Sequence, residues 1–191
     1  MNQLLAVVRD NLKKDGNILE LGCGNGHLSR AIAEEIPEAG KMVAIDFYNQ
    51  PEGLPEKVRF LKQDLENLAI EGKSDLVILN QVFEHIKNPL GLLLTIKKSL
   101  NRHGRILIVV PNRYGFGNEA RVYLPEHGKH YFIWDKESLE FSLERIGFRC
   151  RFYNMYTAAS HQGILKYLPM LLRIQNPNLT CVAMLDDEPE G

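Results

Sequence analysis

Apolar residues along the chain follow two alternating spacings. Over residues 2–14 and 26–36 they recur every three or four positions, which predicts amphipathic helices. Between and after these stretches come short, nearly continuous apolar runs, which are typical of strands buried on both faces of a sheet. The runs predict strands at residues 17–21, 41–46, 57–64, 75–80 and 105–111, with later strands near 148–156 and 179–185. Two more helices are expected at 88–104 and 135–148, the first with Pro89 near its start and the second with Asp135 as its N-cap.

Strands that alternate with helices predict an α/β fold, a doubly wound and mostly parallel sheet with helices on both faces. In such sheets the ligand binds beyond the carboxyl ends of the strands. Residues 47–57, between the second and third strands, contain two prolines and are expected to be mostly loop. The chain shows no internal repeat, so residues 1–185 are interpreted as one domain and residues 186–191 as a flexible tail.

Composition and charge argue against a nonspecific nucleic-acid-binding, a disulfide-linked or a membrane-spanning protein. The 191 residues carry a formal net charge of -1, which argues against dependence on nonspecific phosphate contacts. The three cysteines lie far apart and form no Cys-x-x-Cys pair, so a reducing compartment is expected. Arg9 and Asp10 interrupt the apolar start of the chain, and no stretch is long and apolar enough to span a membrane. We therefore expect a cytoplasmic protein.

A cluster of three glycines within residues 22–26 stands between the first predicted strand and the helix after it. Glycines let the backbone turn sharply and approach a ligand, and the helix points its N-terminus at the same place. Alone, this pattern is weak evidence for a nucleotide-like cofactor. Three acidic residues narrow the choice of cofactor. Glu20 suits an ammonium group, Asp46 suits ribose hydroxyls, and Asp64 ends the third strand. A cofactor with a ribose, an adenine and a positively charged amino acid fits these carboxylates better than a dinucleotide does.

Five segments in order resemble the class I S-adenosylmethionine-dependent methyltransferases, in particular small members of the type 11/23 kind. The segments are ELGCGNG, AIDF, KQDLENL, DLVILNQVFEHIKNP and HGRILIVVPN. The resemblance implies a Rossmann-like sheet of seven strands with a reversed last strand, and S-adenosylmethionine as a cofactor that leaves as S-adenosylhomocysteine. It implies cofactor contacts from Glu20, Gly22, Cys23, Gly24 and Gly26 at the methionine end, Asp46 and Phe47 at the ribose, Asp64 and Leu65 at the adenine, and Asn80 near the methionine.

Acceptor chemistry is expected beyond the fourth and fifth strands. A sulfonium methyl group is already activated, so the protein mainly aligns the acceptor and removes its proton. The catalytic candidates are Glu84, His85 and His130, with His85 as the preferred general base and His130 as a residue that shapes the acceptor pocket. The alternative interpretation of Glu84 and His85 is a packing and turn element, because methyltransferases of different specificity carry a similar pair.

A metal site is a third interpretation of the Glu84-His85 pair. This stretch resembles quinone-pathway O-methyltransferases and small-RNA 3′-terminal 2′-O-methyltransferases that use a divalent ion there, and HYFIW at 130–134 resembles the distal histidine segment of the RNA group. In those patterns an acid lies three residues before the glutamate, where this chain has Gln81, a poor ligand for a hard cation. We therefore expect no metal.

The leading functional hypothesis is methyl transfer to an oxygen or nitrogen of a small molecule. The first alternative is an RNA 3′-end methyltransferase, with Arg113, Arg121 and Lys129 as phosphate contacts. The second is a non-catalytic S-adenosylmethionine-binding regulator or scaffold. Few residues precede the first strand, so we expect an open site or one covered by a second copy or another partner. Residues 112–134 are expected to form a substrate loop, and residues 163–174 to pack against the sheet.

Overall fold

The strands of the computed structural model, which describes residues 1–115, 130–154 and 176–185, form a seven-stranded sheet in the order β3-β2-β1-β4-β5-β7-β6. They are β1 (Ile18–Leu21), β2 (Met42–Asp46), β3 (Val58–Lys62), β4 (Ser74–Asn80), β5 (Leu100–Pro111), β6 (Phe148–Tyr153) and β7 (Asn178–Leu185). Strands β3, β2, β1, β4 and β5 pair in parallel, whereas β7 runs antiparallel to both β5 and β6. The predicted doubly wound sheet with a reversed last strand is therefore confirmed.

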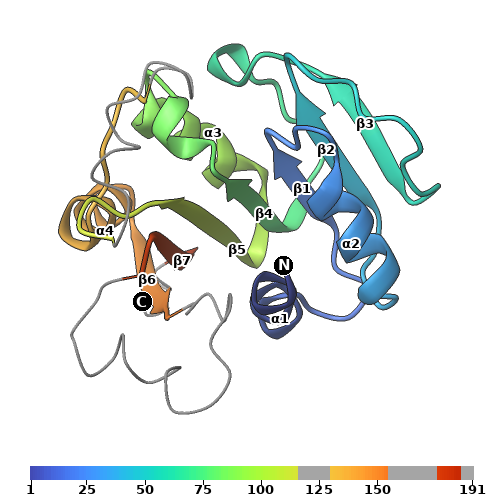
Figure 1. Ribbon diagram of the computed structural model, residues 1–191, viewed down its shortest axis with the longest axis horizontal. Helices are drawn as coiled ribbons and strands as arrows, with labels where there is room; N and C mark the ends of the chain where they lie inside the picture. The colour runs from blue at the N-terminus through green and yellow to red at the C-terminus, as the bar shows by residue number, and fades with distance from the viewer. Residues whose placement is uncertain (116–129, 155–175, 186–191) are drawn as a thin grey trace.

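Both faces of the sheet are covered by helices, as Figure 1 shows. Helices α1 (Asn2–Asn11) and α2 (His27–Glu35) share one apolar cluster with the sheet, and α3 (Pro89–Ser99) and α4 (Lys136–Glu144) share the other. The alternation of side chains along a strand separates the clusters. In β4, Leu76 and Ile78 belong to the α1–α2 cluster, whereas Val77 and Leu79 belong to the α3–α4 cluster. A strand buried on both sides has to be apolar throughout, which explains the continuous runs.

The ends of α3 and α4 show which boundary signals were reliable. Asp135 caps α4 through a capping box with Ser138, and Pro89 occupies the first turn of α3, both as predicted. The helix expected at 88–104, with Gly104 just past its end, is shorter than predicted, because α3 ends at Ser99 and Leu100 pairs with Ser74 in the sheet. Leu100 continues the helical apolar spacing, but it is buried by strand pairing instead.

The connection from β2 to β3 contains no helix between Asp46 and Val58, as the prolines predicted. Within the described residues, no helix is long and apolar enough to cross a membrane. Several predicted features lie outside the described residues. They are Arg121, Lys129, most of the predicted loop 112–134, the segment 163–174 and the tail 186–191.

The strand order places a topological switch point between β1 and β4. From β1 the chain proceeds outward to β2 and β3, and it then returns to β4 on the other side of β1. Loops that leave β1 and β4 therefore diverge, and the crevice between them is the usual ligand site of such sheets. The glycine cluster follows β1 and the Glu84-His85 pair follows β4, so the topology brings these two distant segments to the same edge.

Candidate active site

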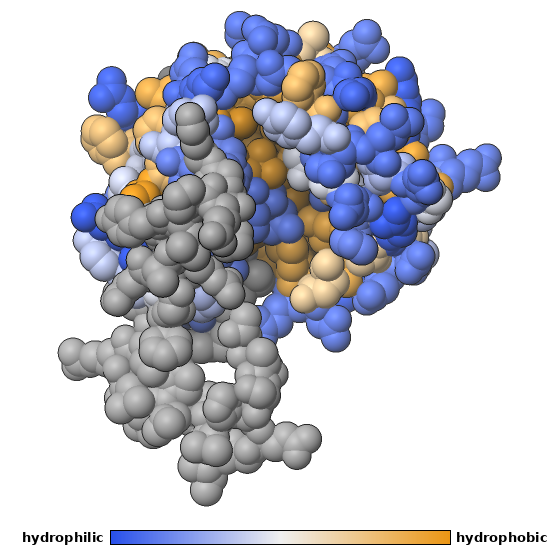
Figure 2. Space-filling view, turned by 45° about the horizontal axis from the view of Figure 1, so that its top comes forward, coloured by the Kyte–Doolittle hydropathy of each residue, from blue (hydrophilic) through white to orange (hydrophobic). Residues whose placement is uncertain are grey.

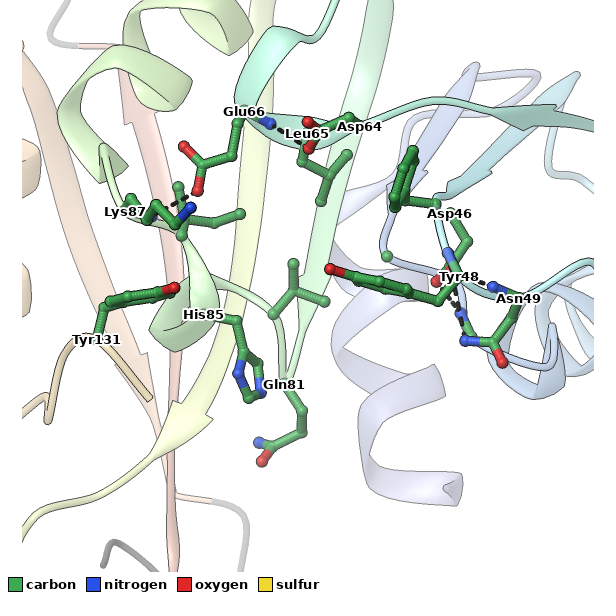
Figure 3. A pocket seen from close by; sticks show the side chains of 15 residues that line it. Asp46, Tyr48, Asn49, Asp64, Leu65, Glu66, Gln81, His85, Lys87 and Tyr131 are labelled. Atoms are coloured by element: carbon green, nitrogen blue, oxygen red, sulfur yellow. Dashed lines mark hydrogen bonds between the residues drawn. The ribbon is translucent and has the colours of Figure 1, made fainter. Parts of the chain in front are cut away.

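A cavity of about 690 Å³ lies at the carboxyl edge of the sheet, within the size range of small-molecule sites. Figure 2 shows a hollow with apolar residues on its floor and hydrophilic residues around it. Figure 3 shows Asp46, Tyr48 and Asn49 on one side of the cavity, and His85, Lys87 and Tyr131 on the other. The lining residues are Gly22, Gly24, Asp46, Phe47, Tyr48, Asn49, Asp64, Leu65, Glu66, Gln81, Val82, His85, Ile86, Lys87 and Tyr131.

The glycine cluster has a backbone that other residues rarely adopt. Gly22 has a φ of 71°, and a Cβ atom there would overlap the side chain of Val82. Gly24 has a φ of 54°, and a Cβ there would meet nothing within 4 Å, so this backbone faces open space in the cavity wall. The carbonyl of Ile45 accepts hydrogen bonds from the amides of Gly22 (2.7 Å) and Cys23 (3.0 Å), which fasten the turn to β2. These two hydrogen bonds fix the shape of the turn.

The Asp46 carboxylate joins the glycine turn to the next loop. It is only 6% exposed, and its Oδ2 accepts a hydrogen bond from the Gly24 amide at 2.8 Å. Its Oδ1 accepts from the amides of Tyr48 (2.9 Å) and Asn49 (2.7 Å), and from the Asn49 side chain at 3.3 Å. A carboxylate offers about four acceptor positions, so most of its capacity is used within the protein. The acceptor positions of Asp46 that remain available toward the cavity are mainly on Oδ2.

Glu20 and Cys23 lie beside the turn but do not line the cavity. Glu20 is 2% exposed, and its carboxylate accepts a hydrogen bond from the Ser29 hydroxyl. Burial raises the pKa of Glu20 to about 7, with the hydrogen bond from Ser29 opposing and the charge of Asp46 adding to the increase. Burial, together with the charges of Glu20 and Asp46, raises the pKa of Cys23 to about 12, so its thiol is neutral and a poor nucleophile.

The third acid, Asp64, caps a short 3-10 turn at the cavity wall. Its carboxylate accepts hydrogen bonds from the amide of Glu66 at 3.0 Å and from the side chain of Asn67 at 3.2 Å. Glu66 in turn accepts from the Lys87 amide at 2.7 Å, which ties the segment after β3 to the segment after β4. Both Glu66 and Lys87 line the cavity.

On the opposite side, Glu84, His85 and His130 come together. Their potential metal-binding atoms all lie within 4.8 Å of one another, and the rings of His85 and His130 meet edge to face with 4.6 Å between centroids. His85 lines the cavity, whereas Glu84 is 1% exposed. Burial raises the pKa of Glu84 to about 7, an increase opposed by a hydrogen bond with its own backbone. These three residues are called the Glu-His-His cluster below.

Two segments far apart in sequence are docked together at this cluster. The Glu84 carbonyl accepts hydrogen bonds from the amides of Tyr131 (2.8 Å) and Phe132 (3.3 Å). Trp134 stacks on Phe83, with 5.1 Å between ring centroids. Backbone bonds and an aromatic stack therefore hold His130 beside His85.

The predicted site residues divide into two groups. Those that line the cavity are Gly22, Gly24, Asp46, Phe47, Asp64, Leu65 and His85; those that do not are Glu20, Cys23, Gly26, Asn80, Glu84 and His130. Sequence reasoning missed Tyr48, Asn49, Glu66, Val82, Ile86, Lys87 and Tyr131. Each of them lies within three residues of a residue that had been singled out. The sequence pattern did not indicate which neighbouring loop residues would face the cavity.

Comparison with known proteins gives the family. Residues 1–151 match the family described as Methyltransferase domain, and the chain belongs to this family. A curated relative, malonyl-[acyl-carrier protein] O-methyltransferase 2 of Ilyobacter polytropus, is 29% identical over 117 residues, which cover 56% of this chain and 44% of the relative. The chain thus spans less than half the length of that protein. The methyltransferase family inferred from the sequence motifs is confirmed.

Solved structures of methyltransferases share the fold. The plantazolicin methyltransferase BpumL, in complex with a monoazolic desmethylPZN analog and SAH, has a TM-score of 0.70 at 18% identity, covering 97% of this chain and 84% of that one. The Burkholderia thailandensis 1,6-didemethyltoxoflavin-N1-methyltransferase, with bound 1,6-didemethyltoxoflavin and S-adenosylhomocysteine, has a TM-score of 0.69 at 18% identity, covering 97% and 77%. At these identities the likeness concerns the fold.

Proposed function

We propose that the protein is an S-adenosylmethionine-dependent methyltransferase that acts on an oxygen or nitrogen of a small molecule. The observation that carries this proposal is that the glycine turn and Asp46 line the same cavity as His85, the member of the Glu-His-His cluster that faces it. The first half suits a nucleoside with an amino-acid chain, and the second half suits an acceptor that loses a proton.

The residues of the cofactor half fit S-adenosylmethionine. The open space beside Gly24 lets a ligand contact the backbone, and the free side of Asp46 Oδ2 can accept a ribose hydroxyl. Asp64 and Leu65 line the wall at the place proposed for the adenine. The carboxylates of Asp46, Asp64 and Glu66 around the cavity favour a ligand with positive charges on an ammonium and a sulfonium. The proposed roles of Glu20, Cys23, Gly26 and Asn80 are to support this wall from behind.

The work of the chain in the reaction is alignment and proton transfer. Bound S-adenosylmethionine supplies a methyl group whose bond to sulfur breaks as the acceptor lone pair attacks, with the electron pair remaining on sulfur. The cavity holds the acceptor on the His85 side, in line with that bond. The acceptor proton then leaves toward the Glu-His-His cluster, where His85 is the member that lines the cavity. His130 and Glu84 fix the position of that imidazole.

An acceptor group of small size is supported by the volume of the cavity and by the names of the relatives. The curated relative is named as an O-methyltransferase of malonyl-[acyl-carrier protein], and the Burkholderia enzyme is named as an N-methyltransferase of a small heterocycle. Lys87 and Tyr131 line the acceptor side, with the Lys87 ammonium 5.8 Å from the centre of the Tyr131 ring. This pair suits an acceptor with an anionic or flat aromatic part.

The proposal is tested by measuring S-adenosylhomocysteine formation with a panel of carboxylic acids, phenols and amines, and with an RNA oligonucleotide that has a free 3′ end. We expect turnover with at least one small acceptor and none with the RNA. Turnover with the RNA alone would support the RNA-end alternative. Binding of S-adenosylhomocysteine without turnover on any acceptor would support the non-catalytic alternative and contradict the proposal.

A further inference from the structure

The Glu-His-His cluster has the composition and spacing of a metal site. Its members come from the turn after β4 and from the segment before α4, and each offers one ligand atom within 4.8 Å of the others. We propose that Glu84, His85 and His130 bind one divalent transition-metal ion at the acceptor end of the cavity. Ion binding stands on these three side chains alone; only its use in methyl transfer rests on the proposed function.

The first support is the environment of Glu84. The side chain is 1% exposed, and among the described residues its Oε2 atom has no hydrogen-bond partner. A buried carboxylate oxygen without a partner is unfavourable, and buried carboxylates are usually paired with a cation or bound to a metal. An ion between Glu84 and the two imidazoles would satisfy this oxygen.

The second support is the donor set. Two imidazole nitrogens and one carboxylate oxygen form the set of a catalytic zinc site with an open fourth position, and imidazole also suits other transition metals. Ligands about 2.1 Å from one tetrahedral ion lie about 3.4 Å apart. The observed upper limit of 4.8 Å therefore requires the ligand atoms to approach by up to about 1.4 Å, through rotation of the side chains about their χ angles.

The third support is the rigidity of the surroundings. The Glu84 carbonyl receives two backbone hydrogen bonds from the segment that carries His130, and Trp134 stacks on both Phe83 and Phe132. Backbone hydrogen bonds and aromatic packing therefore fix the relative positions of the segments that carry Glu84 and His130. Because His85 also lines the cavity, an open coordination position would face the acceptor.

This inference revises the expectation drawn from Gln81. An acid at that position would add a fourth protein ligand, but three ligands are sufficient for a site that keeps a position open. With an ion bound, His85 would be a ligand and would not take up the acceptor proton. An acceptor oxygen at the open position would have a more acidic proton, which it would lose to solvent water.

The test is a titration of chelator-treated protein with Co²⁺, followed by its visible absorption bands and by calorimetry. We expect saturable binding of one ion per chain. Glu84→Gln, His85→Ala and His130→Ala should each weaken binding by about a hundredfold or more. The control variant is His103→Asn, which removes an exposed histidine outside the cluster at a backbone φ of 65° that asparagine tolerates.

Two outcomes overturn the inference: no saturable binding to the wild type, or binding that survives in the cluster variants. Calorimetry with S-adenosylhomocysteine on the same variants shows that each is folded, because that ligand belongs to the other half of the cavity. It also separates the two proposals. A wild-type protein that binds S-adenosylhomocysteine but no ion would contradict the metal site and leave the methyltransferase assignment standing.

Discussion

The two halves of the cavity treat their acidic residues differently. On the cofactor half, Asp46 accepts four hydrogen bonds and Asp64 accepts two, all from neighbouring residues. On the acceptor half, Glu84 is more deeply buried, yet its Oε2 has no partner within the described part of the chain. The cofactor half is therefore stabilised by its own backbone, whereas the acceptor half holds a group that a ligand, a proton or an ion must satisfy.

This difference supports the proposed division of the cavity into a half that binds the cofactor and a half that carries out proton transfer. Acids that are already hydrogen-bonded hold a fixed shape and change little when a ligand arrives. A buried acid beside two imidazoles responds strongly to protons and cations, because each changes its charge in a poorly solvated place. We therefore expect changes in the acceptor half to affect turnover, and changes in the cofactor half to affect affinity and stability.

The largest expected effect is on turnover in His85→Ala. Loss of the imidazole should lower turnover by about a hundredfold or more while S-adenosylhomocysteine affinity stays nearly unchanged. The measurement is steady-state kinetics on an identified acceptor beside calorimetry with S-adenosylhomocysteine, with His103→Asn as the matched control. Full activity in His85→Ala would contradict the expectation that changes in the acceptor half affect turnover.

The next effect concerns the pH dependence conferred by Glu20, the most buried acid near the cofactor half. The pKa of Glu20 is about 7 in the folded protein, compared with an ordinary value of 4.5. Between pH 4.5 and pH 7 the folded state therefore binds more protons than the unfolded state, and this protonation stabilises the folded state. The contribution to the unfolding free energy is fully present below pH 4.5 and is lost as the pH rises through 7. Relative to Glu20→Gln, the wild type should lose about 2 kcal/mol of unfolding free energy between pH 5 and pH 7. Denaturant unfolding at several pH values checks this, and parallel curves for the two proteins would contradict it.

A smaller effect should distinguish Asp46 from Asp64. Asp46→Ala removes the acceptor for the Gly24 amide as well as the proposed ribose contact, whereas Asp64→Ala removes the cap of a short turn. We expect S-adenosylhomocysteine affinity to fall about tenfold more in the first variant than in the second, since hydrogen bonds to charged groups are stronger than others. Calorimetry that gives the reverse order would place the ribose elsewhere.

The cofactor half could be predicted from sequence because its signals are local. Asp46 ends a strand that an apolar run marks, and the glycines follow another such run directly. The internal bonds of Asp46 could not be predicted, because they depend on how the loop after β2 folds back onto the carboxylate. The end of α3 was misplaced for a similar reason, since strand pairing of Leu100 overrides its helical spacing.

The arrangement of the acceptor half depends on contacts between segments far apart in sequence, which could not be predicted from the spacing of residues. Glu84 and His85 are adjacent and His130 was singled out by resemblance, but their separation follows from the docking of Tyr131 on the Glu84 carbonyl and of Trp134 on Phe83. Both contacts join segments more than forty residues apart. The orphaned Oε2 of Glu84 is also a consequence of packing.

The central claim, that this cavity binds S-adenosylmethionine at the glycine turn, is tested most directly by thermal and chemical unfolding with S-adenosylhomocysteine. At a hundred times its Kd the ligand should add about 2.7 kcal/mol of unfolding free energy to the wild type. Gly24→Asn keeps the left-handed backbone but fills the open space beside the turn, so it should lose this gain. Gly72→Asn, a change at another open left-handed glycine before β4, should keep it. An unchanged wild-type stability at millimolar ligand, or an equal gain in Gly24→Asn, would contradict the assignment.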